Sequence, residues 1–137
     1  MREPAEFEVG AYRYRSALLS AMDQVHLVRR LAPILSALRE AAQDGDPLGM
    51  IGPAVEALGS MPDAAVDYVI NTCMAGVSRQ KPGDTGWAKV WQASVRRPIF
   101  DDITGFELIS ITANVVMAEV GPFWAGLASS LSAASQG

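Results

Sequence analysis

The stretch DAAVDYVINTCMAGVSRQ, residues 63–80, carries the clearest structural pattern in the chain. Its apolar residues recur at the spacing of one face of an α-helix, which predicts a helix over 63–80. Cys73 is the only cysteine and lies in the middle of this stripe, so we expect its thiol to pack in the core. The stripe consists of Val66, Val69, Ile70, Cys73, Met74 and Val77.

The composition is that of a globular chain without a dominant charge. Of the 137 residues, 50% are hydrophobic and 19% are charged, which is enough for one core that needs no disulfide or metal. We expect a single domain over 1–131 and a flexible tail over 132–137. The formal charge of −4 argues against binding of nucleic acid, which normally requires a basic face. A lone cysteine and the lack of an apolar leader favour a reducing cytoplasm.

The N-terminal third predicts a hairpin followed by a helix. Apolar and charged residues alternate over about 6–15, which is typical of two short strands. Ser20, with Asp23 three residues later, has the pattern of a helix N-cap. Pro33 predicts a kink, or two helices that meet, near Ala32. The side chains expected to face inward are Met22, Val25, Leu31, Ile34, Leu35 and Leu38.

The middle of the chain has weaker signals. A short helix is expected over about 48–58, with glycines and a proline that weaken it. Residues 81–86 contain Pro and Gly in the pattern of a loop. Trp87 and Trp91 follow, and the sequence leaves open whether they lie on a helical turn or on an extended segment.

A second long helix is expected over 102–120. Asp101 and Asp102 place negative charge at its start, where the helix dipole favours it. Glu107 and Glu119 lie within this apolar region and argue against a membrane span. Gly121-Pro122 predicts a break before a last helix. These elements together predict a mostly α fold, a single-domain helical bundle with a short N-terminal β-hairpin, centred on 63–80 and 102–120.

The search for catalytic constellations gives no active site. His26 is the only histidine, and Asp23 lies one helical turn before it. One histidine beside one carboxylate is more often a structural hydrogen-bonding group than a general base. The pair Asp101-Asp102 is explained by a helix start. We therefore expect no enzyme, no cofactor and no metal site.

Basic and aromatic residues give the one candidate binding surface. Arginine and tryptophan are common anchors of protein interfaces, although a solvated face explains the charges and core packing explains the tryptophans. We expect partner contacts, as a hypothesis, at Arg29, Arg30, Trp87, Trp91, Arg96 and Arg97.

An ordered set of segments resembles the tail assembly chaperones of tailed bacteriophages and prophages. The resemblance covers about residues 6–125, and no residue in it is catalytic. The segments that carry it are residues 7–14, 22–26, 29–35, 67–73, Trp87, Trp91 and residues 100–102.

The resemblance implies a small, mostly helical protein of the host bacterial cytoplasm. Such a chaperone binds the long hydrophobic tape-measure protein, helps tail tube subunits to gather around it, and is absent from the finished virion. In many such families a programmed frameshift adds a second domain near the C-terminus. The oligomeric state stays open, and a homo-oligomer is one arrangement.

Two other classes remain open. One is a structural tail component, such as a tail-completion or adaptor protein, which would stay in the particle and form a ring. The other is a small enzyme that uses His26 with a carboxylate.

Overall fold

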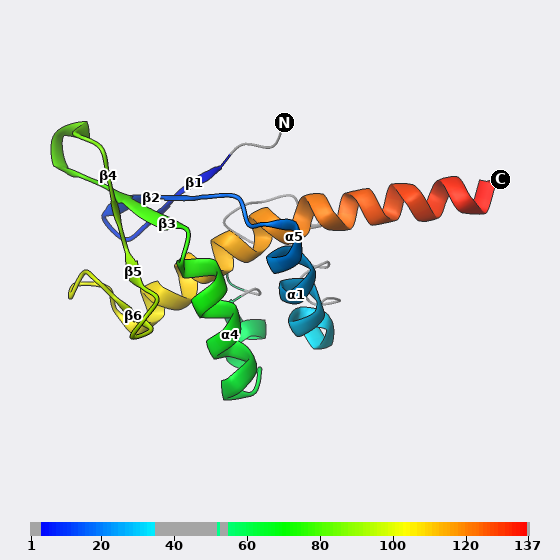
Figure 1. The fold of residues 1–137 in the computed structure, drawn as a ribbon, viewed down its shortest axis with the longest axis horizontal. Helices are drawn as coiled ribbons and strands as arrows, with labels where there is room; N and C mark the ends of the chain where they lie inside the picture. The colour runs from blue at the N-terminus through cyan, green and yellow to red at the C-terminus, as the bar shows by residue number, and fades with distance from the viewer. Residues whose placement is uncertain (1–3, 35–51, 53–54, 137) are drawn as a thin grey trace.

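The computed structural model describes residues 4–34, 52 and 55–136, and Figure 1 shows their arrangement. A four-stranded antiparallel sheet has the order β1-β2-β3-β4. A separate two-stranded sheet pairs β5 with β6. The strands are β1 (Ala5–Val9), β2 (Tyr12–Ser16), β3 (Val77–Gln80), β4 (Trp87–Lys89), β5 (Trp91–Gln92) and β6 (Arg97–Pro98). The helices with stated bounds are α1 (Ala21–Leu31), α4 (Asp63–Met74) and α5 (Gly105–Gln136), with short 3-10 turns η1 (Ala32–Ile34) and η2 (Pro82–Asp84).

The fold is α+β, so the prediction of a mostly α helical bundle with a minor hairpin is wrong. The error lies in the stretch 63–80. Its helix ends at Met74, and Ala75-Gly76 lead directly into β3. From Val77 the burial alternates between buried and half-buried positions, as it does in a strand with one face on a core. Val77 fits both the helical stripe and the strand alternation, so periodicity alone could not locate the change.

The predicted hairpin is confirmed, with one more residue at each end than expected. Val9 pairs with Tyr12, so the connecting loop is Gly10-Ala11. Gly10 has a φ of 61°, a conformation that two-residue hairpin turns require and that glycine adopts without strain. A Cβ on Gly10 would come within 2.6 Å of a carboxylate oxygen of Glu107, so the turn lies close to the start of α5.

Helix α1 begins as the sequence predicts. The backbone N–H of Asp23 donates to the Ser20 hydroxyl at 3.1 Å, and the helix gives way to η1 at Ala32. The prediction that Met22 and Val25 face inward is wrong. Met22 is 64% exposed and Val25 is 45% exposed, while Leu27 and Leu31 are fully buried.

The start of α1 is held against the sheet and α5. The N–H of Ala17 donates to the carbonyl of Gly76 at 2.8 Å, which joins the end of β2 to the start of β3. Glu119 of α5 is only 3% exposed and accepts from the N–H of Leu19 at 3.3 Å and from the side-chain amide of Gln24 at 3.2 Å. The carboxylate inside the apolar stretch thus fastens α1 to α5.

The tryptophan segment is extended. Trp87 begins β4 and Trp91 begins β5, which settles the alternative that the sequence left open. The predicted loop over 81–86 is confirmed, apart from the single 3-10 turn η2 within it.

The long helix α5 begins at Gly105, three residues later than expected. Thr104 caps it: the N–H of Glu107 donates to the Thr104 hydroxyl, and the N–H of Thr104 donates to the Glu107 carboxylate, both at 3.1 Å. Asp102 lies outside the helix, so the assignment of Asp101-Asp102 to its first turn is wrong. The break at Gly121-Pro122 is also wrong, because the backbone stays helical to Gln136 (Figure 1).

Two further expectations are not settled by the structure. Most of the helix expected over 48–58 lies outside the described residues, although 55–59 are helical. The flexible tail over 132–137 stays a prediction.

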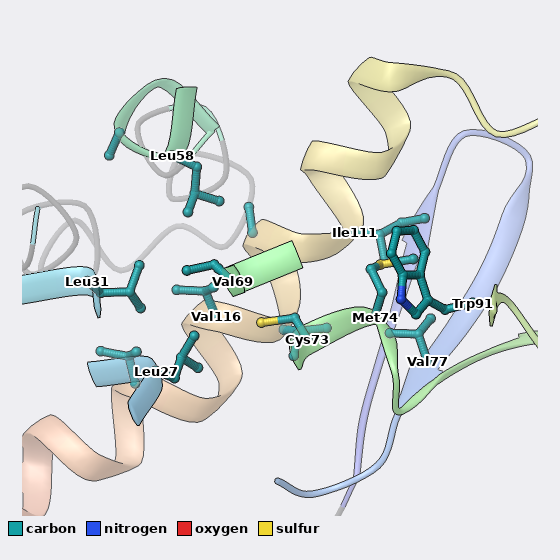
Figure 2. Packing of buried hydrophobic residues seen from close by; sticks show 14 of the residues in the cluster. Leu27, Leu31, Leu58, Val69, Cys73, Met74, Val77, Trp91, Ile111 and Val116 are labelled. Carbon is teal, nitrogen blue, oxygen red and sulfur yellow. The ribbon is translucent and has the colours of Figure 1, made fainter. Parts of the chain in front are cut away.

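The core lies where α4 and the start of β3 pack on the middle of α5 (Figure 2). It contains Cys73, which is 1% exposed, as the sequence predicts. Burial, and secondarily the charge of Glu119, raises the pKa of this thiol well above its usual range. Within the described chain no helix is long and apolar enough to cross a bilayer. Other labelled core residues are Leu27, Leu31, Leu58, Val69, Met74, Val77, Trp91, Ile111 and Val116.

Candidate functional site

The most elaborate polar cluster surrounds Arg79 on β3. Its side chain is buried, and its guanidinium donates to the Tyr14 hydroxyl at 2.9 Å. It also donates to both carboxylate oxygens of Asp102, at 3.0 and 3.3 Å, in a bidentate pair. The guanidinium carbon lies 3.7 Å from the ring centroid of Tyr12 and 4.1 Å from that of Phe100. We call Tyr12, Tyr14, Arg79, Phe100 and Asp102 the Arg79 cage.

The titration of the Arg79 cage follows from these contacts. The hydrogen bond from Arg79 is the main cause that lowers the pKa of Asp102. Burial alone would lower the pKa of Arg79, but hydrogen bonds to Asp102 and Tyr14 outweigh it and the pKa is raised. Burial raises the pKa of Tyr14, in spite of the nearby Arg79. The cage therefore holds a charged pair at neutral pH and offers no activated nucleophile or base, which indicates a structural role.

The sequence missed this cage because it placed Arg79 at the end of a helix. A strand over 77–80 would have put Arg79 on the same face as Val77, facing inward, and a buried arginine requires a carboxylate. The alternation in Val77-Ser78-Arg79-Gln80 was the signal available, but it is only four residues long.

A second cluster contains two of the predicted site residues. Arg29 and Arg30 in the last turn of α1 line an open pocket of about 630 Å³ together with His26 and Tyr68. The guanidinium of Arg30 lies 5.0 Å from the ring centroid of Tyr68 on α4. We call these four residues the basic pocket.

His26 shows no catalytic arrangement within the described chain. The N–H of Asp23 is used to cap α1, and no hydrogen bond joins the Asp23 carboxylate to the His26 imidazole among the described residues. The described residues contain no group of three or more His, Cys, Asp or Glu placed to hold a metal ion.

Among the described residues we consider two exposed apolar regions as contact surfaces. One consists of Leu18, just before α1, and of Met22 and Val25 on α1, with exposed fractions from 40% to 64%, and we call these three residues the α1 apolar face. The other is a groove between β1, an edge strand of the described sheet, and the first turns of α5. Phe106 lies at this groove and is 73% exposed. The groove is lined by Phe7, Glu8, Val9, Gly10, Gly52, Val55, Glu56, Phe106, Ser110 and Asn114.

The other predicted site residues lie elsewhere. Trp87 is half-buried, and the guanidinium carbon of Arg15 lies 4.5 Å from its ring centroid. Trp91 is 7% exposed and its indole N–H donates to the side chain of Asn71 at 2.9 Å, so it lies in the core. Arg96 and Arg97 are exposed around the turn between β5 and β6, where Arg96 has a φ of 53°.

The structure therefore does not gather the six predicted residues into one surface. In Figure 1, α4 lies between α1 and the β5–β6 pair, which separates the Arg29-Arg30 pair from the Arg96-Arg97 pair. Whether any of the six contacts a partner remains a hypothesis.

Comparison with known proteins gives a result that agrees with the resemblance stated above. Residues 10–131 match the family described as phage tail assembly chaperone protein, TAC. No match was found among curated proteins or solved structures. The match spans nearly the whole chain, including strands β2 to β6, α1, α4 and most of α5, and begins just after β1. The chain therefore belongs to the phage tail assembly chaperone family.

Proposed function

We propose that this protein is a non-enzymatic chaperone that binds the tape-measure protein in the host cytoplasm and helps tail tube subunits to assemble around it. The family match over 10–131 carries the proposal. A chaperone of this kind acts during assembly and is not retained in the virion.

The exposed apolar surfaces support the proposal. A long hydrophobic partner needs apolar side chains to cover its own, and contiguous exposed apolar patches typically mark interaction sites. Met22 and Val25 lie three residues apart on α1, which puts them on one side of the helix, and Leu18 precedes them. We propose that the α1 apolar face is the first contact for the tape-measure protein, with Arg29 and Arg30 beside it. Trp87, Arg96 and Arg97 remain further proposed contacts, whereas Trp91 would have to leave the core to make one.

Co-expression with the tape-measure protein encoded nearest to this gene tests the proposal. We expect the tape-measure protein to become soluble and to co-elute with this chain in size-exclusion chromatography. An insoluble tape-measure protein, with this chain eluting alone, would count against the function. Mass spectrometry of purified particles should not detect this chain; stoichiometric amounts would instead favour a structural tail component.

A matched pair of variants tests the surface. The double substitution Met22→Ser and Val25→Ser removes exposed apolar side chains from α1 and should abolish co-elution. Val95→Ser and Ile99→Ser remove two side chains of comparable exposure, 51% and 50%, around the β5–β6 turn. The second pair should leave co-elution intact. Equal effects of the two pairs would show that general surface hydrophobicity, and not the α1 apolar face, holds the partner.

A further inference from the structure

Among the described residues, the two arginines of the basic pocket have no acidic partner, unlike Arg13 and Arg79. Within the described residues Arg13 pairs with Glu6 and Glu8, and Arg79 pairs with Asp102. Over the same residues no carboxylate pairs with Arg29 or Arg30, and none lines the pocket. The chain has a net charge of −4, and these two neighbouring guanidinium groups have no carboxylate partner among the described residues. Their N–H donors are therefore available to bind an anion.

The pocket is formed by two antiparallel helices. α1 runs away from the sheet and α4 runs back toward it, so the last turn of α1 lies beside Tyr68 (Figure 1). The stacking of Arg30 on the Tyr68 ring restricts the guanidinium without using its N–H donors. His26 lies three and four residues before Arg29 and Arg30, so all three project from neighbouring positions of α1. Several donors thus surround one open space of about 630 Å³.

The pocket also continues from an apolar surface. Met22, Val25 and Arg29 lie at positions i, i+3 and i+7 of α1, which is one face of the helix. An occupant of this face meets exposed apolar side chains first and positive charge at the end. The complementary partner is an amphipathic segment whose apolar side is followed by Asp or Glu.

We propose that the basic pocket binds a carboxylate of an acidic, amphipathic segment of the partner protein. Guanidinium groups bind carboxylates through paired N–H···O bonds, and Arg29 and Arg30 are the donors that would make them, with His26 and Tyr68 as the surrounding walls. The identification of that partner as the tape-measure protein rests on the proposed function. The preference of the pocket for a carboxylate rests on the guanidinium groups of Arg29 and Arg30 alone. A nucleic acid is the less suitable anion, because the whole chain is acidic and would repel an extended polyanion.

The first test uses His26, because a single histidine gives one pair of imidazole C–H signals in an NMR spectrum. The full chain is titrated at constant pH and ionic strength with a tetraglutamate peptide and a tetraglutamine peptide, both acetylated and amidated at their ends, and with inorganic phosphate. We expect the His26 signal to shift in a saturable way with tetraglutamate and not with tetraglutamine. No saturable shift with tetraglutamate would overturn the proposal. A tighter response to phosphate than to tetraglutamate would also overturn it and would assign the pocket to phosphate groups.

Two double variants make the titration specific. Arg29→Gln with Arg30→Gln should remove the tetraglutamate response. Arg96→Gln with Arg97→Gln removes the other adjacent arginine pair of the chain and should leave the response unchanged. Circular dichroism and the rest of the NMR spectrum verify that both variants are folded. Equal loss in both variants would show that only the net charge matters.

The second test separates this inference from the proposed function. With the tape-measure protein as partner, the Arg29→Gln and Arg30→Gln variant should bind about tenfold more weakly. The control Lys81→Gln with Lys89→Gln removes two exposed positive charges outside the proposed contacts and should bind as the unmodified chain does. Unchanged binding by the first variant would remove the pocket from the interface and leave the chaperone function standing. If the unmodified chain binds tetraglutamate but not the tape-measure protein, the pocket stands and the proposed function falls.

Discussion

Arg79 and Arg30 are the same side chain in opposite situations. Arg79 is 5% exposed and is surrounded by a carboxylate, a hydroxyl and aromatic rings. Arg30 is exposed and, among the described residues, contacts only the ring of Tyr68. A buried charge must have all its hydrogen bonds satisfied inside the protein, whereas an exposed one can use water until a partner replaces it. The Arg79 cage is therefore expected to act in folding and the basic pocket in binding.

The substitution Arg79→Met should have the largest effect on stability. It removes the guanidinium that donates to the Asp102 carboxylate and to the Tyr14 hydroxyl and that stacks on Tyr12. We expect the free energy of unfolding to fall by about 2–4 kcal/mol. Urea denaturation followed by tryptophan fluorescence measures it. A loss as small as that of an exposed arginine would show that the cage is not a stabilising unit.

The buried thiol predicts a loss of stability at high pH. Since burial raises the pKa of Cys73, the folded state keeps the proton while the unfolded state releases it near the ordinary value of 9.0. The stabilising effect is therefore fully present well below pH 9.0 and is lost above it, with a slope that rises from about half of its limit at pH 9.0 toward about 1.4 kcal/mol per pH unit. Urea denaturation between pH 9 and 10, below the ordinary pKa of Tyr14 of 10.0, measures the slope. Cys73→Ala should reduce this slope, and an equal slope in both proteins would contradict the assignment.

The substitution Asp102→Asn should have a smaller effect, because the Asp102 side chain is 49% exposed. The hydrogen bond from Arg79 lowers the pKa of Asp102, so its stabilising effect is present above the ordinary value of 3.8 and is lost as the pH falls through the lowered folded value. We expect the unmodified chain to lose stability on acidification below pH 3.8 and the variant to lose less over the same range. Thermal unfolding at several acidic pH values compares them.

Replacing Arg29 and Arg30 by Gln should have the smallest effect on stability. Among the described residues, the two charges interact with the C-terminal end of α1 and with the Tyr68 ring, so we expect a change of no more than about 1 kcal/mol. Urea denaturation under the conditions used for Arg79→Met gives the direct comparison. A loss equal to that of Arg79→Met would remove the distinction between the two sites.

The fold could be predicted in its local features but not in its class. The hairpin, the Ser20 cap and the helix end near Pro33 each depend on neighbouring residues, and the structure confirms them. The sheet depends on contacts that sequence spacing does not show, since β2 pairs with β3 more than sixty residues away. The helical periodicity continues across Gly76 into β3, so the predicted helix was extended to residue 80 and the strand β3 was missed.

The candidate site was predicted in its residue types more than in its geometry. Arg29 and Arg30 do lie at a pocket, but its other wall comes from Tyr68 on α4, which only the tertiary structure brings near. Trp91 was expected at a surface and lies in the core, because a tryptophan in the sequence is equally consistent with both places. The exposure of Met22 and Val25 was missed because an apolar stripe was assumed to face inward.

The hydrogen bond between Ala17 and Gly76 has a consequence for the order of folding. It joins the end of β2 to the start of β3, so α1 and α4 leave the sheet from neighbouring points. Arg30 in the last turn of α1 and Tyr68 in the middle of α4 are distant in sequence, and we expect their approach to depend on that junction. The basic pocket is thus a product of long-range pairing, which forms slowly compared with local helices. We therefore expect binding of an acidic ligand to report complete folding of the chain, because helices alone, without the paired strands, would not hold Arg30 beside Tyr68.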